Sequence, residues 1–252
     1  MSKSISRREF TGDSIKTLLA IALVDQLAQA DLLAGPGHAV AAKWLQQVNE
    51  VGQDLRDQKV QQLEWQKQVQ ALFENVEMNR FLKFIDFNKL QSGVKWKDNG
   101  ARSLRFKYPE LKGVPRKLVF GQQIFALKKG RSVVPHGHNN MATAFLILKG
   151  DFHGQHWDRV EDEKDHIIIK PTIDDRFGAG GVSTVSDFKD NVHWFKALED
   201  KSFIFNIHLL GIDPKSKQRT GRVYVDPNGK EIAGGLIRAA RLNSKEAHRL
   251  YG

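Results

Sequence analysis

Cysteine is absent from this sequence of 252 residues. The chain therefore has no disulfide, no thiolate metal ligand and no cysteine nucleophile, so any metal must be held by histidine, carboxylate or carbonyl groups. The sequence also has no phosphate-binding loop, no dinucleotide-binding fingerprint and no Gly-x-Ser-x-Gly nucleophile motif. Histidines and carboxylates are thus the groups on which a reaction could depend.

Acidic residues are fewer than basic ones, 29 against 39, which gives a net charge of +10. The positive residues are scattered, and the densest short cluster is Lys128, Lys129 and Arg131. No nucleic-acid-binding motif accompanies them, so we expect no nucleic-acid partner. A basic surface of this kind attracts anionic substrates or anionic membrane surfaces.

Residues 1–30 resemble an export signal. Lys3, Arg7 and Arg8 make a basic start, an apolar core follows at 17–24, and Ala28-Gln29-Ala30 offers a cleavage site. Ser6-Arg7-Arg8-Glu9-Phe10 is similar to the twin-arginine motif of proteins that are exported already folded. We therefore expect a periplasmic or extracellular protein without a membrane span, because the apolar core is too short to cross a bilayer. The alternative is an amphipathic helix of a cytoplasmic protein.

The remainder of the chain has two kinds of sequence pattern, one helical and one typical of β-strands. Residues 31–95 are expected to be helical and to pack on the rest of the protein, since apolar residues such as Val69, Phe73 and Val76 recur at helical spacing. Residues 96–230 contain short apolar runs separated by Gly, Asp, Asn and Pro, which is typical of a β-sandwich or barrel. We expect a tight turn at 226–229 and a helical tail over 231–252.

The most specific motif is Pro135-His136-Gly137-His138, at the entrance to a predicted strand. Two histidines two residues apart on a strand point to the same side of a sheet. His193, on a later predicted strand, could complete a three-histidine metal site. Neutral imidazoles suit iron, zinc, nickel or copper and leave coordination positions open for a substrate.

This His-x-His spacing, with Gly150 twelve residues after the second histidine, resembles the first signature of the cupin superfamily. The resemblance implies a mainly β protein, a jelly-roll β-barrel with an N-terminal helical segment. The usual cupin glutamate would fall near Thr143. A three-histidine site carries no ligand charge, so it favours an anionic substrate bound to the metal.

Within the superfamily, the chain is most similar to the thiol dioxygenases, the cysteine dioxygenase-like branch. The similarity covers about residues 115–214 and includes Phe145-Leu146-Ile147-Leu148 after the His-x-His motif. It implies Fe(II) as cofactor, with zinc, nickel, copper or manganese as alternatives, and a small molecule and dioxygen as substrates.

The same resemblance implies roles for three further residues. His208 and Asn206 would be catalytic, and Arg116, in Arg116-Lys117-Leu118-Val119, would bind the substrate carboxylate. Leu210 stands where the family has a tyrosine. That tyrosine is therefore missing from the site unless Tyr224 or another residue reaches in. Cysteine itself is therefore a doubtful substrate.

His153 and His156 follow the glycine turn and lie three residues apart, so on a strand they face opposite sides and at most one points inward. His153 is a further candidate ligand.

We thus expect an Fe(II) dioxygenase that acts on a small anionic substrate, with a thiol as one option. A non-catalytic cupin that binds metal or ligand stays open, as does an isomerase or lyase on a sugar-like substrate with His208 as base. A homodimer is possible, because cupins often pair their barrels.

Overall fold

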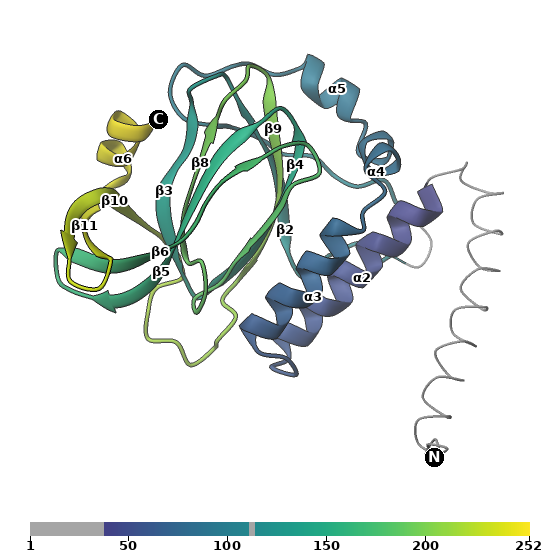
Figure 1. The fold of residues 1–252 in the computed structure, drawn as a ribbon. Coiled ribbons are helices and arrows are strands. Elements are labelled where there is room, and N and C mark those ends of the chain that lie inside the picture. The colour runs from purple at the N-terminus through teal and green to yellow at the C-terminus, as the bar shows by residue number, and fades with distance from the viewer. Residues whose placement is uncertain (1–37, 111–113) are drawn as a thin grey trace, which may run out of the picture.

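The computed structural model describes residues 38–110 and 114–252 of the chain (Figure 1). The predicted export signal at 1–30 lies outside the described residues. None of the described helices has the length and the apolar character needed to cross a membrane. The described helices are α2 (His38–Arg56), α3 (Gln62–Glu74), α4 (Met78–Phe84), α5 (Phe87–Ser92) and α6 (Ser244–Tyr251).

Eleven strands make up most of the rest of the described chain. They are β1 (Arg102–Leu104), β2 (Gly121–Leu127), β3 (Ser132–Asn139), β4 (Met141–Lys149), β5 (Phe152–Asp162), β6 (His166–Phe177), β7 (Val182–Val185), β8 (Val192–Ala197), β9 (Ser202–Leu210), β10 (Gly221–Ile232) and β11 (Leu236–Leu242).

The strand order is that of a jelly roll. One sheet has the order β1-β2-β9-β4-β7, and the other joins β6, β5, β8 and β3. The eight strands from β2 to β9 are therefore divided between two facing antiparallel sheets, and the chain changes sheet after every strand except β5, in the double Greek-key pattern that jelly rolls share. The predicted fold class, a mainly β barrel with N-terminal helices, is confirmed.

Helices α2 to α5 cover the outer face of the β2-β9-β4 sheet (Figure 1). In α2, Trp44, Leu45 and Val48 are buried at helical spacing, which gives the helix one apolar face toward the sheet. The Trp44 indole N–H donates to the carbonyl of Leu72 in α3 at 2.8 Å and so fixes the two helices against each other. Phe205 of β9 lies at the centre of this layer.

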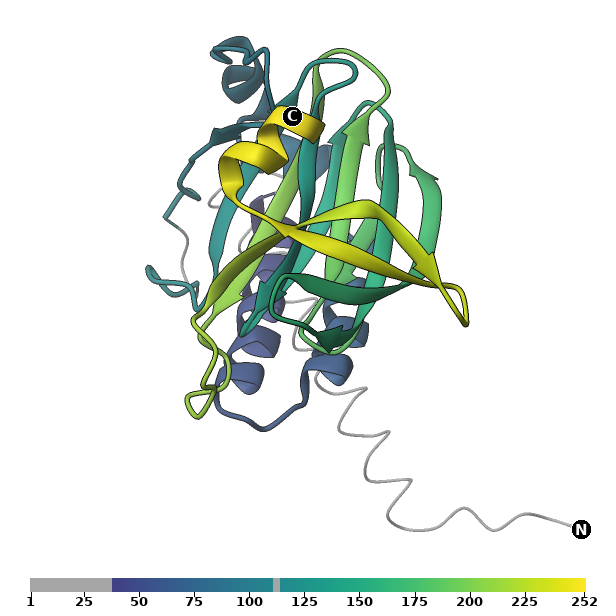
Figure 2. The same cartoon turned by 90° about the vertical axis from the view of Figure 1, so that its left-hand side faces the viewer.

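The second sheet is closed into a six-stranded barrel by the hairpin of β10 and β11. β10 pairs with β3, from Gly221 opposite Asn139 to Tyr224 opposite His136, and β11 pairs with β6. Figure 2 shows the hairpin, in yellow, lying across the strands of this sheet. A separate apolar cluster that includes Trp157, Ile167, Ile169, Val192, Val225 and Ala239 fills the space beneath it.

The hairpin corrects two predictions. Residues 236–242 form β11, so the predicted helical tail begins only at Ser244, where Asn243 and Glu246 form a capping box. The turn of the hairpin contains Gly234 and Gly235, both with positive φ, which glycine adopts without strain.

The predicted turn at 226–229 is instead a bulge inside β10. The Asn228 N–H does donate to Asp226 Oδ1, at 2.9 Å, as turn chemistry predicts. Pairing with β11 nevertheless continues on both sides, with a shift of register between Asp226 and Lys230.

Candidate metal centre

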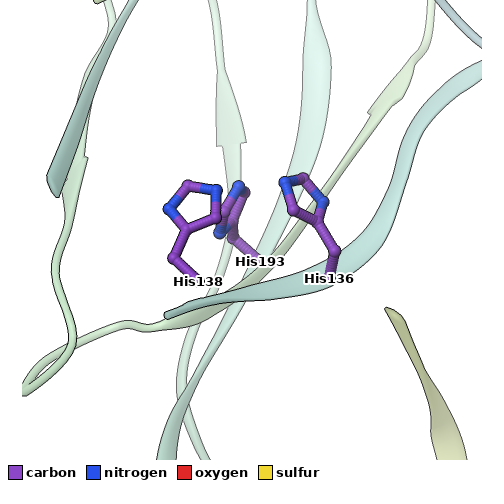
Figure 3. A group of neighbouring side chains, drawn as sticks. All are labelled: His136, His138 and His193. Atoms are coloured by element: carbon purple, nitrogen blue, oxygen red, sulfur yellow. The ribbon is translucent and has the colours of Figure 1, made fainter. Parts of the chain in front are cut away.

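Three buried histidines meet between the two sheets. His136 and His138 point to the same side of β3, and His193 lies directly opposite His136 on the neighbouring strand β8. All three are at most 2% exposed. One ring nitrogen from each lies within 4.8 Å of the others, and Figure 3 shows the rings turned toward a common space. The structure thus brings together the three residues that the sequence singles out as ligands.

Hydrogen bonds fix the tautomers of two of these rings. Nδ1 of His136 lies 2.8 Å from the Val134 carbonyl, and Nδ1 of His193 lies 3.1 Å from the Asn191 carbonyl. Because a carbonyl only accepts, each Nδ1 carries the hydrogen and each Nε2 carries a lone pair. Both Nε2 atoms are buried and have no hydrogen-bond partner among the described residues. A bound metal ion would satisfy both.

All three rings are neutral at physiological pH. Burial, with a smaller contribution from the charge of Arg222, lowers the pKa of His193 to about 3. Burial likewise holds the pKa values of His136 and His138 well below their usual range, with Arg222 and the neighbouring histidines adding to the effect. The neutral imidazole is the form that binds metal.

Thr143 occupies the place beside the ligands where the cupin resemblance leads one to expect a glutamate. Its Oγ1 lies 3.3 Å from His138 Nδ1 and can accept the hydrogen of that nitrogen. The described chain offers no carboxylate to the group, since the ligand cluster consists of His136, His138 and His193 alone. The donor set is therefore neutral, and it fits a divalent ion that keeps its full charge.

A cavity of about 260 Å³ opens onto two of the ligands, His136 and His138. The other lining residues are Gln123, Val133, Met141, Thr143, Phe145, Asn206, His208, Leu210, Thr220, Gly221 and Arg222. Arg222 is the one charged residue among these, so an anion is the complementary ligand.

Arg222 is a cavity residue that no local sequence motif indicates. It lies opposite His138 in the pairing of β10 with β3, so its side chain emerges beside the metal-facing side of β3. The guanidinium lies 6.0 Å from the centre of the Phe125 ring. Arg222 forms no ion pair with any residue in the described ranges, which leaves its donors available to a ligand.

Arg116, the predicted carboxylate-binding residue, is not at the site. Its side chain is 86% exposed and pairs with Glu110 at 3.4 Å. It belongs to a different surface hollow, lined by residues such as Tyr108 and Leu118 and by none of the histidines. The prediction for Arg116 is corrected by this placement, and the motif around it is similar to that of the family in sequence only.

His208 and Asn206 both line the cavity, as their shared position along β9 indicates. Asn206 Oδ1 accepts from His208 Nδ1 at 3.4 Å and from Gln123 Nε2 at 3.2 Å. His208 Nε2 therefore carries the lone pair. Burial, followed by the charge of Arg222, lowers the pKa of His208, so this ring is also neutral. Gly121, opposite His208 on β2, leaves room for the imidazole, because a Cβ there would overlap Nε2.

The inward-facing histidine of β5 is His156, and His153 is no ligand candidate. His153 is only partly buried and pairs with Asp174 at 2.5 Å. His156 is fully buried opposite His193, with its ring centre 6.2 Å from that of His193, and its Nε2 lies 2.9 Å from Ser183 Oγ. Tyr224, considered as a replacement for the family tyrosine, lies with its ring centre 6.0 Å from that of His136 and does not line the cavity.

Comparisons with known proteins add a structural likeness. Neither protein-family models nor curated proteins give a match. Similar solved structures include a cupin superfamily protein of Desulfitobacterium hafniense (16% identity, 48% of this chain and 86% of that chain, TM-score 0.31). Another is a protein of Klebsiella pneumoniae with a double-stranded β-helix domain (12% identity, 53% and 85%, TM-score 0.34).

A third similar structure is procruciferin, an 11S globulin of Brassica napus, at 10% identity and a TM-score of 0.28. The matched region is 36% of this chain and only 20% of that globulin. Overlaps this loose carry no argument about activity. The fold description rests on the strand order of the chain itself, and the candidate metal centre rests on its histidine geometry.

Proposed function

We propose that this protein is a metal-dependent oxygenase, a non-haem Fe(II) dioxygenase that acts on a small anionic substrate. The observation that carries the proposal is a group of three neutral histidines, His136, His138 and His193, of which two line a cavity. Arg222, which has no ion pair among the described residues, lines the same cavity. The histidines supply no charge to offset that of the metal, and the arginine adds positive charge. An anionic ligand is therefore favoured twice over.

The size and lining of the cavity define the substrate class. About 260 Å³ accommodates a molecule smaller than most drug-sized ligands. Arg222 presents a planar fork that binds a carboxylate in bidentate fashion. Val133, Met141 and Phe145 line the walls with apolar surface. A short carboxylate that carries a thiol or an enol fits these features.

Two residues of β9 have a role in proton transfer. His208 is neutral and bears its lone pair on Nε2, so it can accept the proton that a thiol or enol loses on binding. Asn206 holds the ring in this tautomer and is itself held by Gln123. When bound, Fe(II) supplies a redox-active Lewis acid with open coordination positions for a chelating anion and for dioxygen.

The test is metal content followed by oxygen uptake. The full chain is loaded with Fe(II) under anaerobic conditions, and metal is measured by mass spectrometry for wild type, His193→Ala and His153→Ala. We expect about one equivalent in wild type and in His153→Ala, and none in His193→Ala. Oxygen electrodes then report uptake with a panel of small thiol and enol carboxylates.

Other outcomes of these measurements identify the alternatives. One equivalent of metal without oxygen uptake on any compound favours a binding protein. Turnover that persists without oxygen favours an isomerase or lyase with His208 as base. Retention of full metal by His193→Ala contradicts the metal centre itself.

We also propose that the protein is exported, which is supported by residues 1–30 alone. Amino-terminal sequencing of the protein from fractionated cells tests this. A mature chain that begins near residue 31 in the exported fraction is the expected result, and an uncleaved chain in the cytoplasm contradicts the proposal.

A further inference from the structure

Asn191 lies at the junction between two of the candidate ligands. It is 1% exposed and comes two residues before His193, at the start of β8. Its Nδ2 donates to the carbonyls of His138 at 2.9 Å and Ser186 at 2.8 Å, and its Oδ1 accepts from the His138 N–H at 3.2 Å. Two carbonyls and one N–H leave a single orientation for the amide.

The main chain of Asn191 serves the other ligand. Its carbonyl oxygen accepts from Nδ1 of His193 at 3.1 Å, the bond that directs the Nε2 lone pair of this ring toward the cluster. One residue therefore grips the backbone of His138 through its side chain and fixes the ring of His193 through its main chain. The two histidines come from different strands, and Asn191 links them.

The strand beside Asn191 makes room for its amide. A Cβ at Gly137 would stand 2.6 Å from Asn191 Oδ1, well inside van der Waals contact. The glycine between His136 and His138 thus lets the amide approach the backbone of β3. The His-Gly-His sequence and Asn191 fit each other as a unit.

Helix α3 supports this unit from outside the barrel. The Ser186 hydroxyl donates to Gln66 Oε1 at 2.5 Å, and Gln66 Nε2 donates to the Thr184 carbonyl at 3.1 Å. Gln66 and Ser186 are both buried. The chain of contacts therefore runs from α3 through Ser186 to Asn191 and on to His138.

We propose that Asn191 is a positioning residue that sets the mutual placement of His138 and His193 and thereby the metal affinity of the centre. The inference rests on the proposed function in one respect, that these histidines bind a metal. Residues that orient metal ligands from behind typically change affinity by about 10- to 100-fold when they are removed. Asn191 does so for two ligands at once.

The experiment is a Co(II) titration of the full chain, followed by calorimetry and by the visible absorption of the bound ion, which reports its geometry. Asn191→Ala removes the amide. Gly137→Ala keeps the amide but pushes it away with one methyl group, at a glycine without positive φ. The matched controls are Asn49→Ala, which loses a buried side-chain bond to the Val119 N–H, and Gly93→Ala, whose added Cβ meets nothing closer than 3.6 Å.

We expect Co(II) affinity to fall about 10- to 100-fold in Asn191→Ala and to fall in Gly137→Ala. The absorption spectrum should change in both, while both controls keep the wild-type affinity and spectrum. Wild-type affinity in a folded Asn191→Ala or Gly137→Ala overturns the proposal, even if that variant is less stable without metal. If Asn191→Ala does not fold, Gly137→Ala decides.

Failure of the proposed function gives a different result. If the wild-type chain binds none of Co(II), Fe(II) and Zn(II), the proposed metal centre is contradicted, and so is the proposed role of Asn191. If the wild-type chain binds metal and the variants bind it equally well, only the proposed role of Asn191 is contradicted.

Discussion

Arg222 stands opposite His138 in the antiparallel pairing of β10 with β3. This one register position places a cation beside a neutral candidate metal ligand, although the two residues belong to distant parts of the sequence. The charge of Arg222 contributes to the low pKa of all three candidate ligands and of His208. The arginine thus favours the neutral form of the histidines, which is the form that binds metal, and it lines the same cavity as His136 and His138.

Replacement of Arg222 by glutamine should weaken substrate binding. Hydrogen bonds to charged groups contribute about 1.5–3 kcal/mol, which corresponds to a rise in KM of about 10- to 100-fold. Metal content should not change, since Arg222 is not a ligand. Arg116→Gln is the control, because Arg116 is exposed and lies outside the cavity. A larger effect in Arg116→Gln than in Arg222→Gln contradicts the assignment.

The metal-free protein should lose stability as the pH falls below about 6.5. Burial lowers the pKa of His156 from 6.5 to about 3, so between these values the unfolded chain binds a proton that the folded chain does not. The free energy of unfolding therefore decreases toward acid, by up to about 1.4 kcal/mol per pH unit for each such histidine. Urea unfolding at a series of pH values between 7 and 4 measures this slope.

His156→Asn provides the comparison for that slope. With one buried histidine fewer, its dependence on pH should be shallower than that of wild type by up to about 1.4 kcal/mol per pH unit, whatever its absolute stability. An identical slope in both proteins means that His156 is protonated equally in the folded and unfolded chains, contrary to the low pKa.

Gly121→Ala should impair turnover and spare the metal. The new methyl group would overlap His208 Nε2 and displace the ring from its place opposite Gly121. We expect kcat to fall about 10²- to 10⁴-fold, the usual contribution of a positioned general base. Mass spectrometry should still find one equivalent of metal. Unchanged kcat would remove His208 from the reaction.

Phe205→Ala should destabilise the helical layer against the sheet. The Phe205 ring is fully buried, and four aromatic rings surround it with centres 5.0–6.3 Å away, those of Trp44, Phe73, Phe81 and Phe106. Loss of a ring from such a site costs about 3–5 kcal/mol. Phe188, which is 67% exposed, is the control, and its replacement by alanine should change stability by less than about 0.5 kcal/mol. Chemical denaturation measures both.

The local part of the site follows from sequence, and the long-range part does not. The spacing of His136 and His138 determines that they share a face of a strand, and Asn206 and His208 share a face for the same reason. The parity argument also holds for His153 and His156, but it cannot say which face is inward. That depends on the pairing of His156 with His193, which tertiary structure decides.

Arg222 and the C-terminal hairpin could not be found in this way. The strand around Arg222 is readable, but its partner is β3, far away in the chain. The sequence after residue 230 reads as a helix unless Gly234 and Gly235 are taken as a turn, and without that turn there is no hairpin to bring Arg222 to the site. A local motif favours Arg116 instead, and such a motif carries no information about distance from the histidines.

The closing hairpin has a consequence for how such a protein can diversify. The candidate metal ligands lie on β3 and β8, inside the jelly roll, whereas Arg222, the proposed anion-binding residue, lies on β10, outside those eight strands. Substitution in β10 can therefore alter the choice of substrate while the metal-binding strands keep their sequence. If the proposed function holds, selectivity for the organic molecule and selectivity for the ion would depend on separate segments of the chain.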